Sequence, residues 1–200
     1  MPAAYSGCYG MKPTHGLVPY TGIMPIESTL DHAGPMTQNV ADNALMLEVI
    51  AGADGLDPRQ YNVVTDTYTR AVTAGASGLK IGIVKEGFGH ANSEADVDQK
   101  VRAAANILRE CGASVDEISV PWHLKGLPIW TPIASEGATN QMMHGNGMGT
   151  GWEGMYTTSL LDYHANWRGR ADELSDTLKI TMFVGHYFLK HHREIGRAHV

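Results

Sequence analysis

Two side chains near the N-terminus could do chemistry, the hydroxyl of Ser6 and the amine of Lys12. A serine becomes a useful nucleophile beside a base, and a desolvated lysine can serve as that base. The residues around Ser6 lack the Gly-x-Ser-x-Gly pattern of a nucleophile elbow, and spacing assigns no base to it. Lys12 precedes Pro13 in a segment that reads as a strand. We therefore interpret both side chains as structural, with Lys12 in an ion pair or a turn contact.

Histidines near the C-terminus raise the question of a metal site. His186, His191 and His192 lie near one face of a predicted helix, but no His-Glu-x-x-His motif accompanies them. The glycine-rich segment 145–149 does not stand between a clear strand and a helix, so it does not indicate a phosphate loop. We expect it to form a surface loop or part of a pocket. The sequence thus predicts neither a metal nor another cofactor.

The cysteines and tryptophans show no reactive pattern. Cys8 and Cys111 have no visible activating partner, so we expect both to be small buried hydrophobic residues. Trp122, Trp130 and Trp152 cluster in a segment rich in methionine, where they could line an apolar pocket or pack in a core.

Length and composition describe an ordinary globular protein of one domain, with 200 residues, 43% hydrophobic residues and 18% charged residues. The net charge of -6 argues against a phosphate-binding surface, so nucleic acid is not an expected partner. The sequence contains neither a membrane-spanning apolar stretch nor a secretory signal, and two distant cysteines make no disulfide framework. These features predict a soluble cytoplasmic protein without a membrane partner.

Hydrophobic periodicity predicts an α/β fold. Residues 79–84 read as a strand, followed by a helix that Asn92 or Ser93 could cap and that Gly112 ends. A second strand over 115–120 completes a strand-helix-strand unit, which is typical of a mainly parallel or mixed sheet. Glycine and proline recur every few residues in the segment 1–25, which predicts short strands and turns there. We expect helices over residues 40–51, 157–167 and 172–190.

Several segments, in this order, resemble the amidase signature family. They are Pro2–Gly16, Gly34–Asp42 and Ala51–Pro58. Further along, Ile81–His90, Val120–Leu124 and Gln141–Gly147 are similar to the broad-specificity bacterial amidases found beside nitrile hydratases. The resemblance implies a partial amidase signature fold over residues 1–193, with a mixed central sheet covered by helices and truncated at both ends.

Amidase signature enzymes hydrolyse carboxylic amides to an acid and ammonia by acyl transfer. The resemblance implies a serine nucleophile, a second serine held by a cis peptide bond, and a neutral lysine, with backbone N–H groups that stabilise the oxyanion. All these groups precede the segment that Met1-Pro2-Ala3 matches, so no residue here receives a catalytic role and we expect the chain to be inactive alone. Trp130 and Asn146 are the expected substrate-binding residues. The expected partner is a small amide, and intact relatives suggest a homodimer.

The C-terminal residues 194–200 do not resemble the family. Ile195–Val200 read as the translation of a common sequencing adaptor, so we expect a non-native tail. Two alternatives to an amidase fragment remain open. One is a non-catalytic scaffold or binding protein derived from an amidase. The other is part of the A-subunit of a tRNA-dependent amidotransferase.

Overall fold

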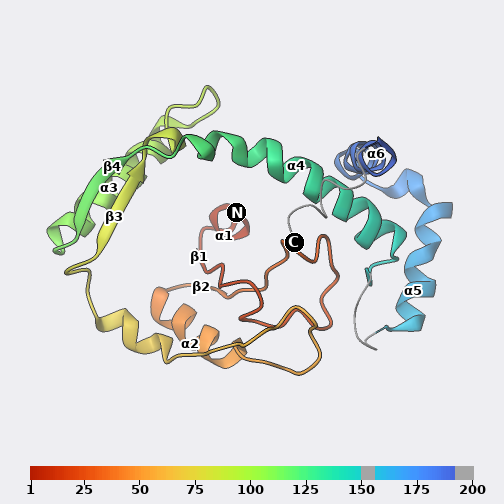
Figure 1. The fold of residues 1–200 in the computed structure, drawn as a ribbon, viewed down its shortest axis with the longest axis horizontal. Helices are drawn as coiled ribbons and strands as arrows, with labels where there is room; N and C mark the ends of the chain where they lie inside the picture. Colours follow the sequence, from red (N-terminus) through yellow and green to blue (C-terminus); the bar gives the residue numbers. More distant parts are fainter. Residues whose placement is uncertain (150–155, 192–200) are drawn as a thin grey trace. The chain divides into compact units, whose positions relative to one another are not determined.

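Short helices and two small sheets make up the chain, which a computed structural model describes over residues 1–149 and 156–191 (Figure 1). Chain contacts divide it into two compact units. One contains Met1–Thr69 and the described residues from Trp130 onward, and the other contains Arg70–Ile129. The α/β class that the sequence predicts is confirmed. The predicted tail at 194–200 lies outside the described residues.

The N-terminal segment begins with a helix rather than the expected strands. α1 spans Pro2–Ser6, with proline in its first turn and a left-handed Gly7 at its end. A short antiparallel sheet follows, in which β1 (Tyr9–Gly10) pairs with β2 (Met36–Thr37). The prediction of short strands and turns is therefore wrong for residues 2–6, because proline and two alanines favour a helical turn there.

The predicted helix after the Gly-Pro turn is present as α2 (Val40–Ile50). Asn39 caps its N-terminus by accepting a hydrogen bond from the Asp42 N–H at 2.8 Å. Buried Asn43 fixes the helix on the small sheet, because its amide donates to the carbonyl oxygens of Tyr9 and Pro35 at 3.2 Å each.

The unit Arg70–Ile129 contains the predicted strand-helix-strand motif. β3 (Lys80–Val84) and β4 (Ser114–Ile118) are parallel neighbours, and α3 (Ala95–Glu110) connects them. Gly112 adopts φ of 93° directly after the helix, as the sequence predicts for a C-terminal stop. The core of this unit comprises Ala76, Ala105, Ala113 and Val115, with Ile81, Ile83 and Leu108 packed against it.

Details of this unit differ from the prediction. The residue before α3 is Glu94, which makes no side-chain cap, so neither Asn92 nor Ser93 caps the helix. Cys111, the residue that follows α3, is exposed rather than buried, and Cys8 is partly buried.

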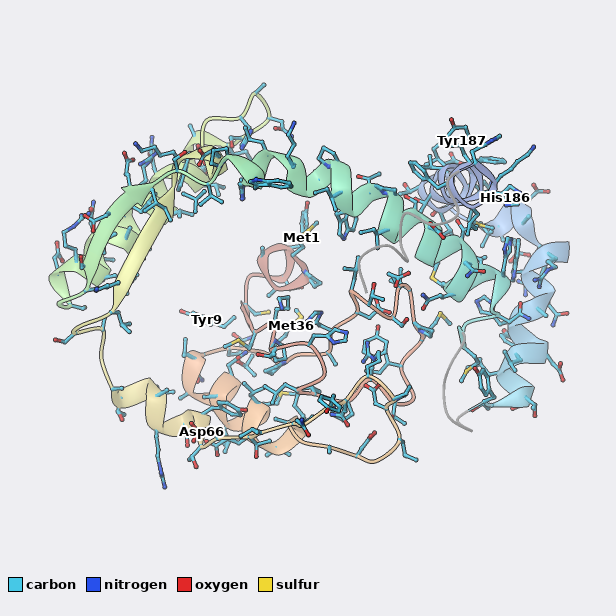
Figure 2. All side chains as sticks on the ribbon, viewed as in Figure 1. Met1, Tyr9, Met36, Asp66, His186 and Tyr187 are labelled. Atoms are coloured by element: carbon cyan, nitrogen blue, oxygen red, sulfur yellow. The ribbon has the colours of Figure 1, made fainter. Side chains whose placement is uncertain are left out.

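Three helices follow in the C-terminal part. α4 (Gly126–Gly137) continues into a π-helical segment over Ala138–His144, while α5 (Thr158–Ala165) and α6 (Asp176–His191) correspond to the two predicted helices. The sequence did not predict α4, because the glycine and prolines within it are typical of helix breaks. His186 and Tyr187 extend from α6 in Figure 2.

At Gly185 the backbone of α6 lies close to Ser135 in α4 and to Thr139 in the π-helical segment. A Cβ atom at this position would collide with the carbonyl oxygen of Ser135 and with the hydroxyl oxygen of Thr139. Thr139 is almost fully buried, and its hydroxyl donates to the carbonyl oxygen of Met182 at 3.4 Å. Only glycine permits this separation of the two backbones.

Candidate functional site

The candidate functional surface combines the loop 22–32 with the segment 141–148, which lie far apart in the sequence. Gln141 joins them: its Oε1 accepts from the N–H of Ser28, and its Nε2 donates to Glu27 Oε2, both at 3.0 Å. A Cβ atom at Gly137 would lie 2.5 Å from Glu27 Cβ, so this loop packs directly on the end of α4. The amide of Gln141 thereby fixes the loop relative to the turn that contains Asn146.

Asn146 occupies a left-handed position, with φ of 52°, in the turn after the π-helical segment. Its Oδ1 accepts a hydrogen bond from Arg168 Nη1 at 2.9 Å. Trp167 supports the same turn, since its indole N–H donates to the carbonyl oxygen of Met143 at 3.0 Å. Asparagine tolerates this backbone conformation better than most residues, which explains its place in the glycine-rich segment. The glycine-rich segment therefore forms a turn that Trp167 and Arg168, just after α5, hold in place.

Two hollows adjoin this turn. A small cavity of about 70 Å³ lies between the loop and the turn, and its lining comprises Gly22, Ile23, Met24, Gly147, Met148, Thr157 and Leu160. A larger hollow of about 290 Å³ opens along the end of α5 and is lined by Tyr163, His164, Asn166, Trp167, Arg170, Glu173 and Leu174. The smaller one has room for about two water molecules or a small apolar group.

The structure does not bring the two predicted substrate-binding residues together. Trp130 lies near the start of α4 and is 54% exposed, whereas Asn146 follows the π-helical segment. The helical rise between them is roughly 20 Å. Trp122 is also exposed, so neither tryptophan packs in a core formed by the described residues; Trp152 lies outside those residues.

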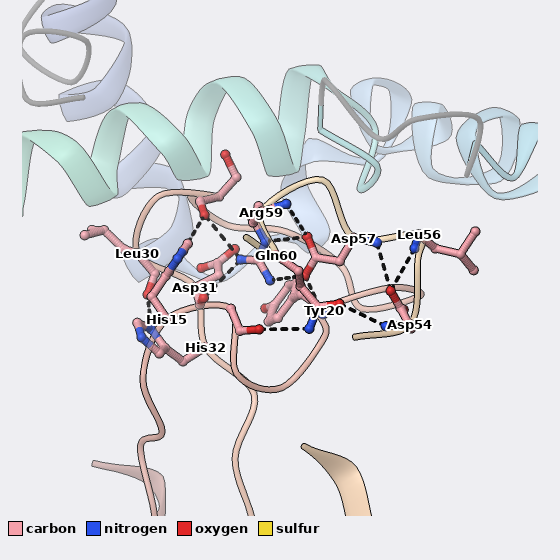
Figure 3. A network of polar contacts seen from close by, with 12 residues as sticks. His15, Tyr20, Leu30, Asp31, His32, Asp54, Leu56, Asp57, Arg59 and Gln60 are labelled. Atoms are coloured by element: carbon pink, nitrogen blue, oxygen red, sulfur yellow. Dashed lines mark hydrogen bonds and ion pairs between the residues drawn. The ribbon is translucent and has the colours of Figure 1, made fainter. Parts of the chain in front are cut away.

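A buried ion pair between Asp57 and Arg59 anchors the loop on its other side. Arg59 Nη2 lies 2.9 Å from Asp57 Oδ2, and the two side chains are 10% and 0% exposed. Asp57 Oδ2 also accepts from the N–H of Tyr20 at 2.8 Å, and the Arg59 guanidinium lies 4.6 Å from the centre of the Tyr20 ring. Figure 3 shows these three side chains converging. Burial raises the pKa of Asp57, but the hydrogen bonds from Arg59 and Tyr20 outweigh it and lower the pKa overall.

Arg59 extends this network to the loop itself. Its Nη1 donates to the carbonyl oxygens of Ser28 at 3.2 Å and Asp31 at 3.0 Å. The carboxylate of Asp31 accepts from the N–H groups of Ile26 and Glu27 at 2.7 and 3.0 Å. Burial raises the pKa of Asp31, and these hydrogen bonds oppose the rise only in part. No local pattern in the sequence marks the Asp57–Arg59 pair, because its partners lie 28 to 37 residues upstream.

A cluster of basic groups lies where the loop meets the N-terminal segment. His32 Nδ1 donates to the carbonyl oxygen of Leu30 at 2.6 Å, and His32 Nε2 accepts from Lys12 Nζ at 3.3 Å. The ring of His15 contacts that of His32 edge to face, with centroids 5.3 Å apart. Burial lowers the pKa of His32, as do Lys12, His15 and Arg59, while the bond to Leu30 opposes the shift. Lys12 makes the predicted turn contact through its bond to the Pro13 carbonyl oxygen at 3.1 Å.

Acidification should destabilise this cluster. The folded-state pKa of His32 lies below the ordinary value of about 6.5, so the unfolded chain takes up the proton first. The contribution of His32 is therefore complete above pH ~6.5 and is lost as the pH falls through the folded-state pKa. His32→Gln should flatten the pH dependence of the free energy of unfolding, and Lys12→Met should flatten it in part. Pulse proteolysis in urea at several pH values measures both effects.

His144 provides the internal control for that experiment. Burial lowers the pKa of His144, and His186 and Arg168 lower it further. His144 is unchanged in the His32→Gln variant, so its contribution to the pH dependence remains. The difference between the wild type and the variant thus isolates His32. An unchanged pH profile in His32→Gln would contradict the prediction, because it would show that His32 does not contribute to the pH dependence of the free energy of unfolding.

The remaining residues that could do chemistry do not gather in one site. Ser6 is exposed at the end of α1. His144 and His186 have ring centroids 6.0 Å apart, and within residues 1–149 and 156–191 no group of three or more potential ligands could hold a metal ion. His192 lies outside this range. Among the same residues, no helix combines the length and the apolar character that crossing a bilayer requires.

Comparison with known proteins identifies the family. The profile of the family described as Amidase matches residues 1–197, so the chain belongs to the amidase family, as its resemblance to amidase signature enzymes predicts. An enantioselective amidase of Rhodococcus rhodochrous is 43% identical over 190 residues, which cover 94% of this chain and 36% of that protein. The A-subunit of the glutamyl-tRNA(Gln) amidotransferase of Lysinibacillus sphaericus is 37% identical over 188 residues, covering 94% of this chain and 38% of that protein.

A solved structure shows the same fold. The crystal structure of the glutamyl-tRNA(Gln) amidotransferase A-subunit from Thermotoga maritima is similar with a TM-score of 0.64 at 23% identity, over 95% of this chain and 37% of that chain. The chain thus spans less than two fifths of the length of the relatives it matches.

Proposed function

We propose that this chain is part of an enzyme that hydrolyses carboxylic amides to an acid and ammonia. The observation that carries the proposal is the 43% identity to an enantioselective amidase over nearly the whole chain. The reaction would be acyl transfer to a serine, assisted by a second serine and a neutral lysine. The resemblance of Gln141–Gly147 to the amidases found beside nitrile hydratases supports amides formed from nitriles as the substrate class.

The part of the enzyme in this chain would form scaffold and substrate-side surface, without the catalytic residues. The contacts of the two chemical candidates support this division. The ammonium group of Lys12 donates hydrogen bonds to Pro13 and His32. Ser6 is exposed at the end of a five-residue helix. Trp130 and Asn146 remain the proposed substrate-binding residues. The half-exposed indole could contact an apolar acyl group, and Arg168 holds the Asn146 turn in place.

The isolated chain is expected to release no ammonia from simple amides such as acetamide, propionamide or benzamide. The reason is that a serine without an adjacent base is a weak nucleophile, and Ser6 has no such neighbour by sequence. Ammonia release by the purified chain, compared with a mock purification, measures this. Turnover that survives purification and disappears in Ser6→Ala would contradict the proposal, because it would place the nucleophile within this chain.

The second candidate is part of an amidotransferase A-subunit, which would act on misacylated tRNA. The 37% identity to the A-subunit of a glutamyl-tRNA(Gln) amidotransferase favours it. The genes on either side of the coding sequence discriminate between the candidates: genes for the other amidotransferase chains support the tRNA reaction, and nitrile hydratase genes support free amides. A chain bounded by its own start and stop codons would instead favour a non-catalytic scaffold or binding protein.

A further inference from the structure

No step of the proposed reaction uses the larger hollow along the end of α5 (Figure 1). All of its lining residues come from the single stretch 163–174, which contains the last turn of α5 and the two 3-10 turns Asn166–Gly169 and Ala171–Glu173. The hollow therefore lies within one of the two compact units. Its volume of about 290 Å³ exceeds the ~150 Å³ that is enough for a benzene ring. We refer to it as the α5 hollow.

Aromatic and aliphatic side chains form the walls of the α5 hollow. Tyr163 and Trp167 are four residues apart, a spacing that places two side chains on the same face of a helical segment. Two contacts fix the indole of Trp167: its N–H donates to the carbonyl oxygen of Met143 at 3.0 Å, and the Arg168 guanidinium lies 4.8 Å from the ring centre. Leu174 adds an aliphatic surface. Such walls favour a flat aromatic ligand.

His164 supplies a polar group to the α5 hollow. Its Nδ1 atom is buried and has no hydrogen-bond partner among residues 1–149 and 156–191. The opposite side of the ring packs on Gly147, because a Cβ atom there would lie 3.3 Å from His164 Cδ2. The Cε1–Nε2 edge is thus the part of the imidazole that can reach the hollow. A proton on Nδ1 would be a buried donor without an acceptor, so the neutral ring carries its proton on Nε2 and offers an N–H donor.

The rim of the α5 hollow carries two charges that cancel. Arg170 Nε donates to Glu173 Oε1 at 2.8 Å, and a second bond from the guanidinium to Oε2 makes the pair two-pronged. A carboxylate that entered the hollow would be attracted by Arg170 and repelled by Glu173, and it would also lose hydration. An uncharged acceptor avoids both the repulsion and the loss of a charge's hydration. The rim therefore favours a neutral ligand over an anion.

We propose that the α5 hollow binds a small neutral aromatic carbonyl compound. Its ring would pack against Tyr163 and Trp167, and its carbonyl oxygen would accept a hydrogen bond from the Nε2–H of His164. The proposal goes beyond the proposed function and does not depend on it, because the ligand need not be an amide and no bond is broken. Acetophenone is the test ligand, since it has the ring and the carbonyl group but no amide bond. A molecule of this size is expected to bind with a Kd on the order of 1 mM.

The stability of the purified chain in the presence of acetophenone measures binding. A ligand that binds only the folded chain lowers the unfolding equilibrium constant by the factor 1 + [L]/Kd, so about 5 mM should lower it roughly 6-fold in pulse proteolysis. His164→Phe should lose this effect, because phenylalanine keeps a ring but has no N–H donor. Without ligand, this variant should be at least as stable as the wild type, because a buried nitrogen without a partner has been removed.

His123→Phe is the matched control, because His123 is an exposed histidine in the other compact unit. It should keep the whole effect of acetophenone.

Benzoate tests the selection against charge at the rim. It should leave the unfolding equilibrium constant of the wild type nearly unchanged. Glu173→Gln removes the repelling carboxylate and leaves the Arg170 guanidinium to pair with the ligand, so benzoate should then act as strongly as acetophenone. Arg170 and Glu173 are 59% and 61% exposed, so the substitution itself should hardly change the free energy of unfolding.

Four outcomes would overturn the proposal. The first is that acetophenone has no effect on the wild type. The second is an effect of the same size in His164→Phe, which would place the ligand elsewhere. The third is a His164→Phe chain that is clearly less stable than the wild type without ligand, because Nδ1 would then have a structural partner such as a water molecule. The fourth is a benzoate effect that Glu173→Gln does not change.

Discussion

Replacing Arg59 with alanine should lower the free energy of unfolding by about 3–5 kcal/mol, the usual cost of removing one partner of a buried ion pair. The Asp57 side chain is fully buried and would keep a charge without its counterion. The carbonyl oxygens of Ser28 and Asp31 would also lose a donor. Arg59→Lys should recover only part of the loss, because an ammonium cannot match the two-pronged geometry of the guanidinium.

Pulse proteolysis in urea measures this effect at chain concentrations low enough for aggregation to be slow. Lys179→Ala is the matched control, because it also removes the cation of an ion pair. Lys179 lies 3.7 Å from the carboxylate of Asp176, and this pair is on the surface. We expect the control to leave the free energy of unfolding nearly unchanged. Equal effects of the two substitutions would show that burial of the Asp57–Arg59 pair does not determine its contribution.

Gly185→Val should lower the free energy of unfolding by about 3 kcal/mol, at the upper end of the range for overpacking. The added side chain would enter the space of the Ser135 carbonyl oxygen and the Thr139 hydroxyl. A backbone carbonyl cannot rotate away as a flexible side chain can, so α6 must move and lose its packing. Valine and glycine differ in helix propensity by less than ~0.5 kcal/mol, so the substitution isolates the steric effect.

The same urea assay and tryptophan fluorescence report this change. Gly169→Ala is the control, because beyond the two neighbouring residues no atom lies within 4 Å of the added Cβ. We expect it to be neutral or slightly stabilising, since alanine restricts the unfolded chain more than glycine does. A Gly185→Val chain as stable as the wild type would mean that α6 does not pack closely on Ser135.

Family membership and the elements with strong local signals follow from the amino-acid sequence alone. The strand-helix-strand unit around α3 and the helix α2 follow from hydrophobic periodicity, which depends on residues close together in the chain. Family membership follows from several segments in the correct order, and the profile match over residues 1–197 confirms it.

Which polar side chains contact one another became known from the tertiary structure. The Asp57–Arg59 pair meets Tyr20 and Asp31, and Gln141 meets Glu27 and Ser28, across sequence separations that no local pattern records. α4 also needed the structure, because tertiary packing overrode the helix-breaking tendency of its prolines. The pair contacts that fix the candidate surface depend on where the chain folds back on itself, and residue type and spacing do not contain that information.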